Sequence, residues 1–319
     1  MSISNEALQA FYKSQKWSFN KCLEPTMRCD KPAIRAHSVQ NARAMDLISE
    51  ADHVYGLSGK LVDREPNAQF TRLSRNKAST FCGLCNSHDT EIFKQIDTRP
   101  IDLKDSEQLF LISYRSIIKE LHALMEGGIR TQKAYNDGVK QGRVPANQMN
   151  EAMMVATSAL VRGYEAYQFR VKFYDLSYLR QKFRTIQHSV FVIENRAPMI
   201  AASSTFSVKD RVLKKDPLYL MTLNLIPLSE TQTAVIASYP DQYRTIARKY
   251  LAPVFANAGR DQLYELSYLI INRAENFFMK PSVVESWTPE RRGIIEREFF
   301  ATAGLPIDAP RLPELMLFD

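Results

Sequence analysis

The sequence predicts an α+β fold in three consecutive parts, and three patterns lead to this prediction. All four cysteines lie within the first 90 residues, apolar side chains recur at helical spacing over residues 102–185, and residues 189–238 alternate with a period of two. We therefore expect a metal-stabilised domain over residues 1–100 and a long helical hairpin over residues 101–185. An antiparallel sheet with covering helices, whose role the sequence does not reveal, is expected over residues 186–319.

The composition is typical of an ordinary globular protein. The chain has 319 residues, of which 45% are hydrophobic and 24% charged, so it can bury a sizeable core, which excludes a disordered or collagen-like chain. It has no run of ~18 apolar residues, and its first residues lack the basic start and apolar core of a secretory signal. We therefore expect a cytoplasmic protein that does not contact a membrane.

The central part begins with helix-capping side chains. Asp102–Asp105 precede an apolar-periodic run that continues to Leu124, so a helix is expected to begin there. Gly127-Gly128 is expected to interrupt this helix, and Pro145 is expected to open a second helix that continues to about Thr185. The pattern therefore indicates two long helices with a frayed connection.

Four strands and several shorter helices complete the expected fold. Segments rich in Val, Ile, Thr and Tyr predict strands over residues 189–194, 200–208, 218–227 and 233–238. Helices are expected over residues 1–19, 241–257 and 260–278, and another is expected to begin at Thr288, an N-cap residue followed by proline. The proline-containing tail after Gly304 is expected to extend along the surface.

The spacing of the cysteines predicts a metal site. Cys22 and Cys29 are followed, after 52 residues, by Cys82 and Cys85, and the chain has no other cysteine. Zn²⁺ prefers four tetrahedral thiolate or imidazole ligands, and an ion that joins two distant pairs would stabilise a segment without a large core of its own. Two ligand sets remain open: the four cysteines, or Cys22, Cys29 and Cys85 together with His88.

A series of motifs accompanies the two cysteine pairs. After the first pair come Ala36-His37-Ser38-Val39, then Asn76, then Phe81-Cys82-Gly83-Leu84-Cys85-Asn86-Ser87-His88-Asp89. This order resembles the HNH, or ββα-metal, treble-clef family over residues 21–97. It also resembles uncharacterised bacterial proteins of phage-defence or mobile-element type. The resemblance implies a treble-clef domain that holds a structural zinc ion.

The resemblance also implies a function. In the HNH family a separate His/Asn/His set holds a catalytic metal and activates water to hydrolyse a phosphodiester. By resemblance, His37 is the general base, Asn76 orients it, and His88 or Asn86 binds a catalytic Mg²⁺ or Mn²⁺ ion. The resemblance thus implies a nucleic-acid-engaging zinc protein, and in its most specific form an HNH-type endonuclease of bacterial defence.

The distribution of charge favours a polyanionic partner, either DNA or RNA. The formal net charge is +7, with an excess of three basic side chains in residues 1–100, four in residues 101–200 and none in residues 201–319. Within residues 162–184, basic side chains are interleaved with aromatic ones. That pattern suits contacts to phosphates and bases, or a packed helix face with a solvated basic side.

Two other functions fit the same sequence. In the first, the zinc domain is a non-catalytic binding module for nucleic acid or protein. In the second, the helices over residues 102–185 form a homo-oligomer interface in an interaction protein. Metal-dependent cleavage that is lost in His37→Ala would separate the endonuclease from both.

Overall fold

The chain folds into two compact units. In the computed structural model the described residues are 18–62, 65–146, 148–209, 218–303 and 307–319, so the helix expected over residues 1–19 lies almost wholly outside them. The first unit contains the chain up to Ala36, Phe81–Glu91 and Ile117–Arg180, and the second contains His37–Thr80, Ile92–Ser116 and Gln181–Asp319. The division into domains over 1–100, 101–185 and 186–319 stays a prediction.

Three helices carry the middle of the chain. They are α2 (Asn86–Thr98), α3 (Ser106–Lys140) and α4 (Glu151–Arg170). The predicted start of α3 is confirmed, because Asp105 Oδ1 accepts hydrogen bonds from the backbone N–H groups of Glu107 and Gln108. No described helix is both long and apolar enough to cross a lipid bilayer.

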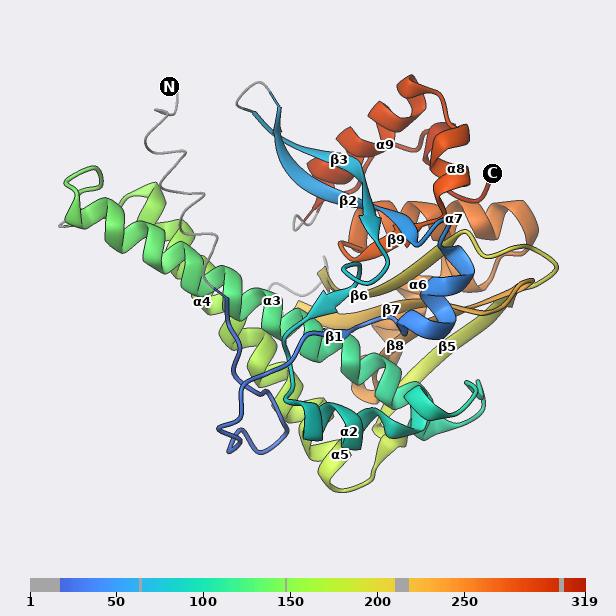
Figure 1. Ribbon diagram of the computed structural model, residues 1–319, viewed down its shortest axis with the longest axis horizontal. Helices are drawn as coiled ribbons and strands as arrows, with labels where there is room; N and C mark the ends of the chain where they lie inside the picture. The colour runs from blue at the N-terminus through green and yellow to red at the C-terminus, as the bar shows by residue number, and fades with distance from the viewer. Residues whose placement is uncertain (1–17, 63–64, 147, 210–217, 304–306) are drawn as a thin grey trace. The chain divides into compact units, whose positions relative to one another are not determined.

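Gly127 and Gly128 lie inside α3, so the predicted interruption is wrong. A Cβ on Gly128 would lie 3.5 Å from the carbonyl oxygen of Ala159, and one on Gly163 would lie 3.5 Å from Met125 Sδ. Both distances are those of ordinary van der Waals contact, so α3 and α4 pack against each other at the two glycines. The two helices lie side by side in the first unit, where Figure 1 draws them in green.

The helix changes from α-helical to π-helical geometry at the end of α4. One π-helical turn over Val171–Asp175 and one α-helical turn, α5 (Leu176–Leu179), follow it, so the helix expected to continue to Thr185 ends at Leu179. The aromatic side chains of this segment are divided between core and solvent. Tyr174 is fully buried, whereas Tyr164 is 63% exposed.

The second unit is built on a seven-stranded antiparallel sheet with the order β3-β2-β9-β6-β7-β8-β5. The strands are β2 (His53–Val62), β3 (Glu65–Ser74), β5 (Ile186–Ile193), β6 (Ile200–Lys209), β7 (Leu218–Ser229), β8 (Gln232–Pro240) and β9 (Phe277–Met279). The antiparallel sheet and the four strands expected between residues 189 and 238 are confirmed, with ends that differ by a few residues. β6, β7 and β8 form the expected meander, but β5 pairs with β8 instead of β6.

Three strands of this sheet were not predicted. The hairpin of β2 and β3 comes from the cysteine-containing part of the sequence, where we expected a segment organised by a metal. β9 is a three-residue strand that the sequence placed at the end of a helix, and it pairs with β2 on one side and β6 on the other. All three of its side chains are buried, so it shows neither the alternation of a half-exposed strand nor helical spacing.

Helices cover the sheet, as expected. They are α6 (Arg244–Phe255), α7 (Gly259–Arg273), α8 (Pro281–Ser286) and α9 (Pro289–Thr302). α6 contacts β5 and β8, α7 contacts β6, and α9 contacts β3 (Figure 1). Thr288 is the N-cap of α9, as predicted, because its side chain accepts a hydrogen bond from the backbone N–H of Arg291.

The prediction that the C-terminal tail extends along the surface is wrong for its last residues, although Pro310, Arg311 and Pro313 before them are exposed. Leu315, Met316, Leu317 and Phe318 are all buried in the main apolar core of the second unit. The backbone N–H of Leu317 donates to Ser267 Oγ at 2.9 Å. The prolines correctly indicated an irregular backbone. The apolar residues that follow them pack into the core because burying their surface is favourable.

Candidate metal centre

Four side chains of the first unit converge as the ligands of a metal ion would. The Sγ atoms of Cys22, Cys29 and Cys85 and one ring nitrogen of His88 all lie within 4.8 Å of one another. Cys29 Sγ lies 3.8 Å from Cys85 Sγ, and His88 Nδ1 lies 3.4 Å from Cys22 Sγ and 3.3 Å from Cys85 Sγ. A tetrahedral zinc site with usual bond lengths has S–S edges of about 3.8 Å and S–N edges of about 3.6 Å. The group is therefore positioned to bind a metal ion, and its donor set suits zinc.

The structure brings together one of the two ligand sets that the sequence left open. Cys85 directly precedes α2, and His88 lies in its first turn, three residues later on the same face. Cys82 is half-buried and, among the described residues, belongs to no group that could hold a metal. The centre is thus Cys₃His, and the Cys82-x-x-Cys85 motif contributes one ligand instead of two.

The loop over residues 22–29, which we call the metal loop, is organised by a buried carboxylate. Glu24 Oε1 accepts hydrogen bonds from Thr26 Oγ1 at 2.7 Å and from the backbone N–H groups of Arg28 at 2.5 Å and Cys29 at 3.2 Å. Burial raises the pKa of Glu24, but these bonds and one from the N–H of Thr26 lower it below its usual value. The carboxylate therefore closes the unusually wide Cys-x₆-Cys spacing by satisfying the donors inside the loop.

Backbone hydrogen bonds join the metal loop to the Cys82–Cys85 segment. The N–H of Leu23 donates to the carbonyl of Gly83 at 2.7 Å, and the N–H of Cys85 donates to Cys22 Sγ at 3.2 Å. Gly83 lies where these two segments meet, and the position requires a residue without a side chain. A Cβ there would lie 2.8 Å from Ile118 Cγ2 and closer still to the ring of Phe81, which is shorter than real Cβ contacts.

The two buried thiols differ in acidity. Burial raises the pKa of Cys22 to about 12. Burial also raises the pKa of Cys85, but a hydrogen bond from the backbone N–H of His88 and contacts with the thiols of Cys29 and Cys22 outweigh it and bring the value to about 7. A bound cation would favour the thiolate form of both, so the group gains its full set of anionic donors when an ion is present.

The other predicted site residues lie elsewhere. His37 ends β1 (Ala36–His37) in the second unit, and its Nδ1 donates to the carbonyl of Ala78 at 3.0 Å. Burial lowers its pKa, although the bond to Ala78 raises it. Asn76 is exposed in the turn just before Ala78, so the structure places His37 beside the turn that carries it. His88 belongs to the cysteine group instead, in the first unit.

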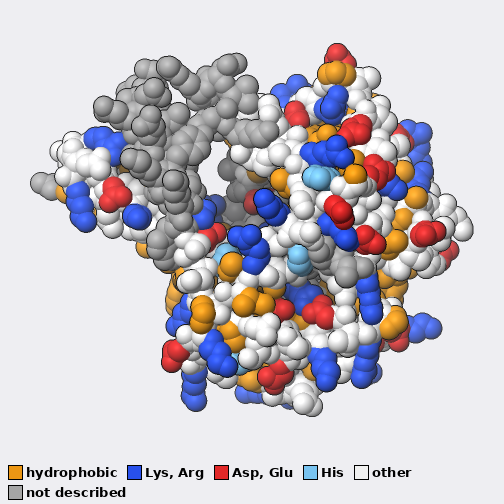
Figure 2. Space-filling view, viewed as in Figure 1, with side chains coloured by type: hydrophobic (Ala, Val, Ile, Leu, Met, Phe, Trp, Pro, Cys, Tyr) orange, Lys and Arg blue, Asp and Glu red, His pale blue; other side chains and the backbone are white. Residues whose placement is uncertain are grey.

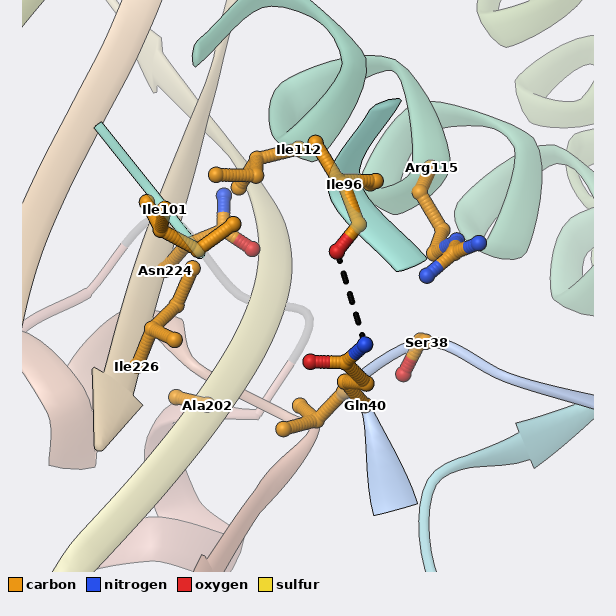
Figure 3. A pocket seen from close by; sticks show the side chains of 10 residues that line it. Ser38, Gln40, Ile96, Ile101, Ile112, Arg115, Ala202, Asn224 and Ile226 are labelled. Carbon is orange, nitrogen blue, oxygen red and sulfur yellow. Dashed lines mark hydrogen bonds between the residues drawn. The ribbon is translucent and has the colours of Figure 1, made fainter. Parts of the chain in front are cut away.

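The residues that follow His37 line a small cavity in the second unit that the sequence did not indicate. Gln40 Nε2 donates to the carbonyls of Ile96 and Asp97 at the end of α2, and Figure 3 shows the bond to Ile96. The volume is about 30 Å³. Asn224 Nδ2 and Arg115 Nε line it without a hydrogen-bond partner among the described residues. Because about 10–15 Å³ holds one water, the cavity suits roughly two waters, which would satisfy these donors.

Comparison of the chain with protein-family models, with curated proteins and with solved structures found no match.

Proposed function

We propose that this chain is a zinc protein in which the ion has a structural role and the segment over residues 18–36, which contains the metal loop, contacts the phosphates of a nucleic acid. One observation carries the proposal. The segment over residues 18–36, which the ion would fix, carries four exposed cations and a single exposed acid, Asp30, because its only other carboxylate, Glu24, is buried. The exposed cations are Lys21, Arg28, Lys31 and Arg35.

The ends of this segment run side by side. Lys21 and Pro32 form an isolated antiparallel β-bridge, and the N–H of Ala33 donates to the carbonyl of Asn20 at 2.6 Å. This pairing gathers the cations on a short closed segment. On the face seen in Figure 2, Lys and Arg side chains are interspersed with Asp and Glu. The proposal therefore rests on the local excess of cations in residues 18–36 and not on the net charge of +7.

Salt dependence tests this contact. Each phosphate contact that a protein makes with duplex DNA contributes about 0.9 to the slope of log K against log salt concentration, and about 0.7 with single strands. We expect R28Q/K31Q to lower the slope by about 1–2, and metal chelation to weaken binding. R248Q/K249Q, which removes two exposed cations of α6, is the matched control. Unchanged slopes in R28Q/K31Q would refute the contact.

A second candidate, metal-dependent phosphodiester cleavage, is favoured by the state of His37. Its Nδ1–H donates to a carbonyl, which leaves the lone pair on Nε2, and its lowered pKa keeps the ring neutral near pH 7. Those are the properties of a general base. Cleavage of plasmid DNA or of RNA with Mg²⁺ or Mn²⁺ should then be lost in His37→Ala and Asn76→Ala while zinc is retained. His88→Ala does not serve as this test, because it also removes a ligand of the Cys₃His group.

A third candidate, self-association, is favoured by the outer side of α4. Met153, Leu160 and Tyr164 are 41%, 46% and 63% exposed, and their spacing places them on one face, beside the face that holds the buried Ala159 and Gly163. We propose that this face joins two copies of the chain. Sedimentation at increasing concentration should show a dimer that Leu160→Glu dissociates, and a monomer at every concentration would exclude it.

A further inference from the structure

The end of α4 carries a buried arginine, Arg170, whose guanidinium contacts the metal loop. Arg170 has no exposed surface. Its Nε donates to Asp175 Oδ2 at 3.1 Å, and its Nη1 donates to the carbonyl oxygen of Leu23 at 3.0 Å. Its Nη2 lies 3.3 Å from Sδ of Met27. Leu23 and Met27 both stand between the two ligands of the metal loop.

Packing alone does not account for an arginine at this position. A buried charge is costly unless it is paired, and Asp175, itself only 1% exposed, neutralises Arg170. The pair leaves guanidinium donors that one carboxylate does not satisfy. The metal loop supplies a further partner, the carbonyl of Leu23, so the loop completes this part of the hydrogen bonding of the charge pair.

The metal loop in turn needs contacts from outside to keep its backbone conformation. Met27 has a φ of 57°, in the left-handed region that a residue with a side chain seldom adopts unless its surroundings enforce it. Arg170 contacts the residue just after one metal ligand and this strained residue. It therefore acts at both sides of the turn that brings Cys22 and Cys29 to the same ion.

We propose that the Arg170–Asp175 pair positions the metal loop, so that metal binding and the order of the turn after α4 are energetically coupled. The inference rests on the metal site of the proposed function and not on nucleic-acid contact. Because coupling is reciprocal, the pair raises the affinity for the ion by the same factor by which the bound ion favours the ordered pair. Arg170 is thus a positioning residue, comparable to the groups that orient metal ligands in other proteins.

The test uses the full-length chain and the variant R170M/D175L, which removes both charges together and leaves no lone buried ion. Zinc affinity is measured by competition with a chromophoric chelator, and Co²⁺ affinity by the absorption of the cobalt-loaded protein. We expect a loss of roughly 10–100-fold in affinity, with far-UV circular dichroism like that of the wild type. R170K should lose less affinity than R170M/D175L but more than the wild type, because it keeps the charge pair but lacks the fork that reaches two partners.

Arg162→Met is the matched control, because Arg162 lies on the same helix but is exposed. It should bind zinc as the wild type does. A folded R170M/D175L with wild-type affinity would overturn the proposal.

A second measurement on the wild type keeps the proposal testable if the variants do not fold. Chelation of the metal should raise hydrogen exchange in peptides that cover residues 165–176, as well as in the metal loop, and leave β7 and β8 protected. If exchange over residues 165–176 is unchanged, the coupling is absent. Neither readout uses nucleic acid, so failure here is distinguishable from failure of the phosphate contact.

Discussion

Replacing Cys29 by alanine tests the metal centre most directly, because Cys82 offers a matched control. Both are half-buried free cysteines, but only Cys29 belongs to the Cys₃His group. Cys29 and Cys85 are 56 residues apart in the sequence. Closing a loop of that length costs roughly 3–4 kcal/mol of chain entropy, which the ion offsets by binding both ends.

We therefore expect Cys29→Ala to bind far less than one zinc per chain and to lower the melting temperature by about 10 °C. Cys82→Ala should keep one zinc and the wild-type melting temperature. Zinc is measured by elemental analysis of purified protein, and melting by circular dichroism with and without chelator. Equal loss of zinc in the two variants, or one retained zinc in Cys29→Ala, would show that the ligand set is wrong.

Three other predictions concern stability. Burial lowers the pKa of His188 from 6.5 to about 4, so the unfolded chain binds more protons between these values and stability falls by up to about 3 kcal/mol as the pH drops through this window. His188→Gln should remove that part of the pH dependence in urea unfolding, and an unaltered profile would contradict the assignment. Gly83→Ala should lower both zinc affinity and melting temperature, whereas Gly127→Ala, with no atom within 4 Å of the added Cβ, should raise stability by up to about 1 kcal/mol. Leu317→Ala should cost about 2–5 kcal/mol in the same assay, and a loss below about 1 kcal/mol would mean that the tail is not packed.

Local patterns predicted the elements that depend on neighbouring residues. The capping side chains of Asp105 and Thr288 predicted the starts of α3 and α9, because a cap bonds to N–H groups two or three residues away. The strands of the meander followed from alternation over short windows. The continuation of α3 through Gly127 and Gly128 was not predicted, because two glycines in a short window indicate a break, whereas the packing of α3 against α4 stabilises the helix and is not encoded locally.

The metal centre was likewise predicted in part from local sequence and decided in part by the tertiary structure. Residue type and pairing within the sequence predicted a zinc site that includes Cys22, Cys29 and Cys85, since thiolates in two groups are the donors that zinc prefers. They left Cys82 and His88 as alternatives for the last ligand. The start of α2 at Asn86 decided between them, because it turns His88 toward the face that Cys85 occupies.

The sequence by itself determined the mixed α and β character, the caps and the ligand types, since these follow from side-chain chemistry and spacing along the chain. Only the tertiary structure decided that β2, β3 and β9 join one sheet, that the apolar residues 315–318 at the end of the tail are buried, and that Arg170 contacts the metal loop. Those contacts join residues far apart in the sequence, such as Tyr55 with Met279 and Leu23 with Arg170, and their free energy depends on which surfaces meet in the folded chain.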